Sequence, residues 1–318
     1  MSASSATSRR NRFLRWTLGA LLGLNLAWPA HALEINFQTV APNVYAYVGD
    51  LEGRTYDNEA LNANLGLVVT RSGAILIDSG ATFKTAAQIA EAVKKITPKP
   101  IRWVINTGGQ DHRWLGNGYF KTHGADIWAH ANAMADMQAR GAEQLRADAA
   151  ILKDKVDGTT VVYPNRWLEG ADSTEVVDGV KLQFVHRLGG HTPGDMMVYL
   201  PETGVVFTGD VVYVDRILGL HSVSKTRNWV NSFAALQALQ PSVVVPGHGQ
   251  VTTLTQAQRD TGQLLQALRA HMQQAVEAGT DISTAVKSFD AAPYKHLKHV
   301  DVWLPQLANL TYLEIEQE

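Results

Sequence analysis

Apolar residues in the first half of the chain alternate between short β-branched runs and stretches with helical spacing. Two of the runs flank the turn Arg71-Ser72-Gly73 and predict a β-hairpin, while Pro98 and Pro100 close a helical stretch. In chain order the pattern predicts strands at 65–70 and 74–78, a helix at 85–96, a strand at 101–105, a helix at 115–122, a strand at 125–129 and a long helix at 131–152.

From residue 174 the pattern changes to short strands separated by turns such as Asp178-Gly179. The expected elements are strands at 175–177, 181–186, 196–200 and 205–208, a helix at 229–239, a strand at 242–245 and a long amphipathic helix at 255–278. This order predicts a four-layer αββα sandwich, with two mixed sheets and helices on their outer faces. Its strand-end loops should meet at one edge and carry the function.

Residues 1–32 have the pattern of a secretory signal peptide. Four arginines precede an apolar run at 16–28, and Ala30-His31-Ala32 supplies small residues at a cleavage site. The run is shorter than the roughly 20 residues that span a bilayer, so no stable anchor is expected. Arg12 disturbs the twin-arginine spacing, which favours Sec export. We therefore expect a periplasmic or secreted protein with one domain at 33–318.

Composition narrows the chemistry. The chain has no cysteine, which excludes disulfides and thiolate ligands, so a transition-metal site must use histidine and carboxylate. Removing the four arginines of the leader changes 28 basic against 30 acidic groups to 24 against 30, a net charge of −6 with histidine neutral. An acidic chain is not suited to nucleic acid or anionic lipid, so we expect a small-molecule substrate.

Four potential metal ligands lie in glycine-flanked loops beside predicted strands: His112, His191, Asp210 and His248. Glycines let a backbone approach a ligand closely, and loops at strand ends can converge on one ion. Three protein ligands and one open position are what a hydrolytic zinc site requires. The alternative is that each histidine is hydrogen-bonded within an ordinary turn.

Five motifs occur in an order that resembles the metallo-β-lactamase-fold superfamily over residues 36–316. They are Asn64-Leu65-Gly66, Ile77-Asp78-Ser79-Gly80, Gly190-His191-Thr192-Pro193-Gly194, Phe207-Thr208-Gly209-Asp210 and Val245-Pro246-Gly247-His248-Gly249. The closing segment at 309–316 further resembles the secreted SoxH-like, or quinoprotein-relay, zinc metallohydrolases. The resemblance implies the αββα fold and a zinc-dependent hydrolase.

The family's central motif, HxHxDH, is degenerate in this chain. Anchoring Asp111-His112 on the DH of the motif places its two earlier histidines on Thr107 and Gly109. That register keeps a full second metal site, whose members would be Asp111, His112, Asp210 and His248.

A second, ungapped register aligns Asn106-Thr107 and Gly116-Asn117 with the family pattern. The motif then falls on Gly108, Gln110, His112 and Arg113. Both registers lose the HxH pair and keep His112. His191 would thereby lose its metal partners and either reach the single ion, bind substrate or cap a turn.

The resemblance implies a periplasmic hydrolase whose single zinc activates water against an ester, thioester or amide. Asp210, with Asp111, would act in proton transfer, and the ion or Arg113 would stabilise the oxyanion. A catalytically impaired relative that binds a partner or metabolite without metal is the alternative. An iron-dependent dioxygenase of the same fold is a third.

Other polar residues have ordinary explanations. Asp78 either orients the metal loops, as the resemblance implies, or forms a turn before Ser79-Gly80. His123 and His130 are expected on the solvated surface. His221, after Leu218-Gly219-Leu220, and Lys225 either line the mouth of the cleft or, as is more common for loop residues, lie on the solvated surface.

Overall fold

The computed structural model describes Met1 and residues 33–318, so the predicted signal peptide at 1–32 falls almost entirely outside the described residues. The first sheet has seven strands in the order β1 to β7. The bounds are β1 Phe37–Ala41, β2 Val44–Tyr47, β3 Leu65–Val69, β4 Ala74–Ile77, β5 Ile101–Ile105, β6 Asp126–His130 and β7 Arg166–Leu168. Strands β1 to β4 pair antiparallel and β4 to β7 pair parallel.

The second sheet has five strands in the order β12-β11-β10-β9-β8. The bounds are β8 Asp172–Val177, β9 Val180–His186, β10 Met196–Leu200, β11 Val205–Phe207 and β12 Val243–Val245. Only the β11–β12 pair is parallel. Both sheets are therefore mixed, as the sequence predicts.

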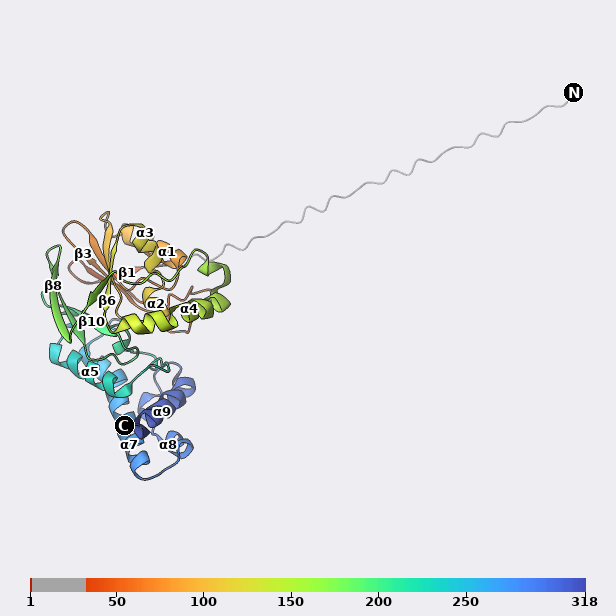
Figure 1. The fold of residues 1–318 in the computed structure, drawn as a ribbon, viewed down its shortest axis with the longest axis vertical. Helices are drawn as coiled ribbons and strands as arrows, with labels where there is room; N and C mark the ends of the chain where they lie inside the picture. The colour runs from red at the N-terminus through yellow and green to blue at the C-terminus, as the bar shows by residue number, and fades with distance from the viewer. Residues whose placement is uncertain (2–32) are drawn as a thin grey trace. The chain divides into compact units, whose positions relative to one another are not determined.

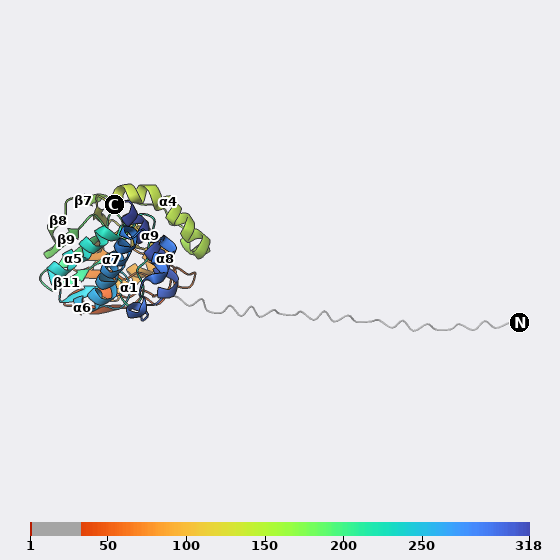
Figure 2. The same ribbon diagram turned by 90° about the horizontal axis from the view of Figure 1, so that it is seen from below.

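Helices cover the outer face of each sheet (Figures 1 and 2). Helices α1 and α3 pack against the outer face of the first sheet. Helices α5, α7 and α9 share one apolar core with the outer face of the second. The bounds are α1 Phe83–Lys94, α2 Asp111–Trp114, α3 Asn117–Thr122, α4 Ala133–Leu152, α5 Thr226–Leu239, α6 Leu254–Ala257, α7 Gln263–Glu277, α8 Ile282–Ser288 and α9 Val300–Glu316. Within the described residues, no helix has both the length and the apolar character needed to cross a membrane.

Strand β10 shows how the alternating pattern builds the layers. Met196, Val198 and Leu200 face the core between the two sheets, whereas Met197 packs against the outer helices. Successive side chains of a strand point to opposite faces, so an apolar run on both faces requires a strand covered on both sides. The four-layer αββα sandwich is thus confirmed.

The helix predicted at 255–278 is interrupted by a π-helical turn, Gln258–Gly262. The turn directs Thr261 toward the loop after β11, where its Oγ1 accepts a hydrogen bond from Tyr213 N at 3.0 Å and donates one to Tyr213 O at 2.5 Å. A π-turn inserts one residue into a helix and redirects its side chains. Apolar periodicity could not reveal it.

His130 is buried, so the prediction of a surface position was wrong, whereas His123 is exposed as predicted. The His130 ring stacks on His186 with centroids 3.6 Å apart. Asn132 satisfies both rings, because its backbone N donates to His130 Nδ1 at 3.2 Å and its amide lies 2.8 Å from His186 Nε2. This arrangement suits two neutral imidazoles.

The stacked pair predicts a specific dependence of stability on pH. Burial, followed by the neighbouring His130, lowers the pKa of His186 to about 4, and burial lowers that of His130. Unfolded histidine titrates near pH 6.5, so below that pH the unfolded chain takes up protons that the folded chain refuses. Stability should therefore fall between about pH 6.5 and pH 4.

Allowing for solvent screening, His186 contributes about 1 kcal/mol of the loss between about pH 7 and pH 5. Urea unfolding of His186→Gln should show a correspondingly smaller loss, and an unchanged pH dependence would contradict this account.

Candidate metal centre

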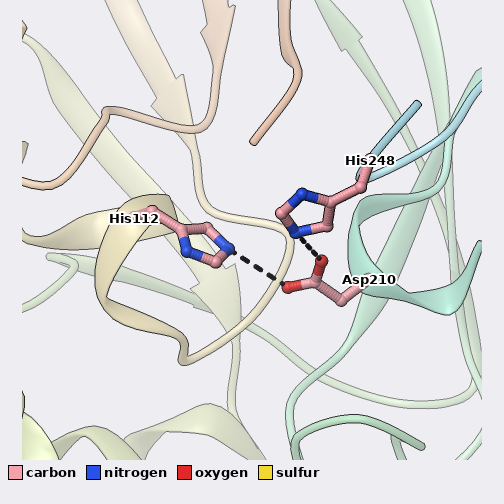
Figure 3. Close-up of side chains that lie close together, drawn as sticks. All are labelled: His112, Asp210 and His248. Carbon is pink, nitrogen blue, oxygen red and sulfur yellow. Dashed lines mark ion pairs between the residues drawn. The ribbon is translucent and has the colours of Figure 1, made fainter. Parts of the chain in front are cut away.

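Three buried side chains from separate strand-end loops form a compact group (Figure 3). His112 lies on α2 after β5, Asp210 lies in the 3-10 turn Gly209–Val211 after β11, and His248 follows β12. One ligand atom of each lies within 4.8 Å of the other two. Four residues in glycine-flanked loops were predicted as metal ligands, and three of them lie together in this group.

The imidazole nitrogens converge on the Asp210 carboxylate. His248 Nε2 lies 3.2 Å from Oδ1, and His112 Nε2 lies 3.5 Å from Oδ2. The fourth predicted ligand, His191, places its Nε2 3.7 Å from Oδ2. The buried Nε2 atoms of His112 and His191 have no hydrogen-bond partner among the residues that the structure describes. Convergent nitrogens of this kind, around an ionised carboxylate, fit a bound cation.

The protonation states also suit a metal. Burial opposes ionisation of Asp210, yet the charge and hydrogen bonds of Arg113 hold its pKa well below the usual range. Burial lowers the pKa of His191 and His248 well below 6.5, so both are neutral near pH 7. Deprotonated imidazole and carboxylate are the forms that bind zinc.

Arg113 is only 1% exposed and donates hydrogen bonds to Asp210. Its Nε and Nη2 donate to the two oxygens of Asp210 at 2.8 and 2.5 Å, and its Nη1 donates to Asp78 Oδ2 at 2.7 Å. Asp78 also accepts from Thr107 N and Oγ1, at 2.7 and 2.8 Å. Asp78 therefore orients the loop after β5, the role implied by its family resemblance. A Cβ atom on Gly247 would come within 2.5 Å of Arg113 Nη2, so only glycine leaves space for this contact.

These contacts correspond to the ungapped register of the degenerate motif. Arg113 points at Asp210, while Asp111 forms an ion pair with Arg54 and is not in the three-residue group. Asp111 Oδ1 instead accepts a hydrogen bond from the backbone N of His112 at 2.6 Å. Asp111 is thus placed to orient the turn that carries His112.

The space beside Gly108 is filled by other residues. A Cβ atom there would lie 2.8 Å from Asp195 Oδ1 and 3.2 Å from Thr192 Oγ1. Thr192 N and Oγ1 in turn donate to Asp195, at 2.8 and 2.5 Å. A histidine at position 108 would displace this hydrogen-bonded pair. The part of the site where the family's HxH pair would lie therefore lacks metal ligands, and Thr192 and Asp195 occupy the space beside Gly108.

A pocket of about 190 Å³ opens over His112, His191 and His248. Sequence reasoning missed most of its other lining residues: Arg54, Tyr213, Arg216 and Trp303. The surface position favoured for His221 was wrong, because its ring also lines the pocket, 4.8 Å from that of His191. The neighbouring Leu218-Gly219-Leu220 was the available signal for His221, whereas nothing local marks Arg54 or Arg216.

A family comparison identifies the superfamily to which this chain belongs. Residues 59–248 match the model described as the Metallo-beta-lactamase superfamily, which is more than half of the chain. The chain belongs to this superfamily. Its fold is that of the metallo-β-lactamase hydrolases, and its three-residue group lies within or at the end of the matched region.

Similar proteins include hydrolases with different named substrates. A linear primary-alkylsulfatase from Pseudomonas sp. (strain ATCC 19151) is 21% identical, covering 58% of this chain and 41% of the relative. A metallo-beta-lactamase type 2 from Elizabethkingia meningoseptica is 24% identical, covering 74% and 88%. The solved sec-alkylsulfatase Pisa1 from Pseudomonas sp. has a TM-score of 0.71 at 20% identity, covering 87% of this chain and 50% of that chain. This chain therefore spans less than half of the linear alkylsulfatase.

Proposed function

We propose that this metallo-β-lactamase-fold protein is a periplasmic hydrolase with one zinc ion held by His112, Asp210 and His248. The convergence of these three buried donors carries the proposal. Zinc suits a set of imidazole and carboxylate ligands without thiolate. His191, whose Nε2 faces the same carboxylate, is the candidate for a fourth contact.

Each protein group has a defined task in this proposal. A bound zinc ion would supply the Lewis acidity that makes water nucleophilic near neutral pH. Asp210 would hold the ion, while Arg113 lowers the pKa of this carboxylate and orients it, which favours metal binding over the proton transfer expected from the sequence. All three polar nitrogens of Arg113 are occupied by Asp78 and Asp210, which favours positioning over the oxyanion contact expected from the sequence. Asp111 positions His112 through the α2 turn.

The substrate is proposed to be an ester, thioester or amide that fits the pocket over His112. The named activity of the alkylsulfatase relatives adds sulfate esters to the classes that should be tested.

Metal analysis tests the proposal directly. Protein purified from the periplasm without added metal should contain about one zinc per chain, and a chelator should lower its thermal stability. A site saturated at 100 times its Kd stabilises a fold by about 2.7 kcal/mol, which such a treatment would remove. Zinc-free protein with undiminished hydrolysis would contradict the proposal, and stoichiometric iron would favour the dioxygenase.

A binding module without metal is the second candidate. One observation favours it: the Arg113 guanidinium already compensates the buried charge of Asp210 without a cation. This candidate predicts purified protein free of transition metal, with a melting temperature indifferent to chelator.

A further inference from the structure

Arg216 is a buried arginine that forms no ion pair with a carboxylate in the described part of the chain. Its residue exposure is 4%, and its Nε has no hydrogen-bond partner within Met1 and residues 33–318. The two other arginines near the site differ, since Arg113 binds Asp78 and Asp210 and Arg54 binds Asp111. A guanidinium carries five N–H donors, and burying it without acceptors is unfavourable.

Among the described residues, Arg216 has one polar side-chain contact, with His248, and that contact gives its N–H groups no acceptor. Its Nη1 lies 3.2 Å from His248 Nδ1, which also lies 2.8 Å from the carbonyl oxygen of Asn62. A carbonyl can only accept, so His248 Nδ1 carries the hydrogen and donates to Asn62. Arg216 therefore meets a second donor at this point and retains unused N–H groups.

The guanidinium is nevertheless held in a defined position at the pocket wall. Its Cζ lies 4.6 Å from the ring centroid of Trp303 and 5.5 Å from that of Tyr213, within the range of cation–π attraction. The loop that carries it is anchored on both sides, by Thr261 of the π-helical turn at Tyr213 and by a 2.9 Å hydrogen bond from Ile217 N to Lys298 O. Such a fixed donor is preorganised for a ligand.

We propose that Arg216 binds an oxyanion group of the substrate, a carboxylate, sulfate or phosphate, and so makes the pocket selective for anionic substrates. The inference rests on the proposed function, because it places that group beside the metal centre. Arg216 and His248 both line the pocket and contact each other, so an oxyanion on Arg216 lies next to the ligand set. The pocket, about 190 Å³, is smaller than the roughly 300–1,000 Å³ typical of drug-sized ligands, which favours a small substrate.

Direct binding of simple anions tests the proposal without requiring turnover. Sodium acetate, sulfate and phosphate would be titrated calorimetrically, at constant ionic strength, into the purified full chain and its variants. At least one anion should bind at a single site. Arg216→Gln should weaken that binding at least about 10-fold, the factor that corresponds to about 1.4 kcal/mol. Arg216→Lys, which keeps the charge but lacks the planar fork, should bind with intermediate affinity.

Arg71→Gln is the matched control, because the Arg71 side chain is 79% exposed and pairs with Asp178 at the surface. It should bind the anions as the unmodified protein does. Absence of binding by all three anions, or equal binding by Arg216→Gln and the unmodified protein, would overturn the proposal. If Arg216→Gln does not fold, Arg216→Lys is compared with the unmodified protein instead.

A kinetic arm separates this proposal from the proposed function. A neutral ester, 4-nitrophenyl acetate, would be compared with an anionic one, mono-4-nitrophenyl succinate. Arg216→Gln should raise KM for the anionic ester alone, with Arg71→Gln unchanged for both. Anion binding without any ester hydrolysis would contradict only the proposed function, whereas hydrolysis of both esters with no effect of Arg216→Gln would contradict only the role of Arg216.

Discussion

Replacing His248 with alanine is expected to lower the affinity for zinc at least about 100-fold and to abolish hydrolysis. Loss of a residue that merely supports a ligand costs about 10–100-fold, and His248 is one of only three donors in the group. The variant also removes the 3.2 Å contact to Asp210 and leaves two donors to hold an ion. Competition with a chromophoric chelator measures the affinity, and the metal content of the same samples measures occupancy.

Two further alanine variants make the result specific. His123 is exposed and its ring nitrogen bonds only within its own neighbourhood, so His123→Ala should bind zinc normally. His191→Ala tests the fourth contact, because a change of less than about 10-fold would exclude it as a main ligand. Undiminished zinc affinity in His248→Ala would show that the ion, if bound, lies elsewhere.

Replacing Arg113 with methionine is expected to destabilise the metal-free protein by about 3–5 kcal/mol. Methionine keeps much of the side-chain volume but removes the cation between Asp78 and Asp210. Both carboxylates are buried, so the variant leaves two like charges without compensation. Urea unfolding of chelator-treated protein measures the loss.

Two comparisons identify the cause of that loss. Arg71→Met disrupts a pair at the surface and should leave the free energy of unfolding nearly unchanged. Adding Asp210→Asn to Arg113→Met should recover part of the stability, since it removes one of the two uncompensated charges. A loss of less than about 1 kcal/mol in Arg113→Met would mean that the two carboxylates do not need the guanidinium.

Much of the architecture followed from local patterns. Strands such as β5 and β10 occur at the predicted residues, 101–105 and 196–200, because their apolar runs are bounded by turn residues. Strands with a weak signal, such as β1 and β7, were missed, and so was α9, although its buried residues Leu304, Leu307 and Ile315 have helical spacing. β7 has only three residues, of which one is exposed and one partly exposed, so no clear apolar run marks it.

The sequence by itself predicted the fold class and selected His112, Asp210 and His248, together with His191, as candidate ligands. Strand periodicity and glycine-flanked turns are local properties of the chain, and they mark the first three of these residues as members of strand-end loops, two on the second sheet and one on the first. Only the tertiary structure decided the register around His112, the partner of Asp111 and the isolation of Arg216. Those facts depend on which charges meet across long separations, such as the 97 positions between Arg113 and Asp210 or the 57 between Arg54 and Asp111. A charge is stabilised by atoms that surround it in space, and no local pattern specifies them.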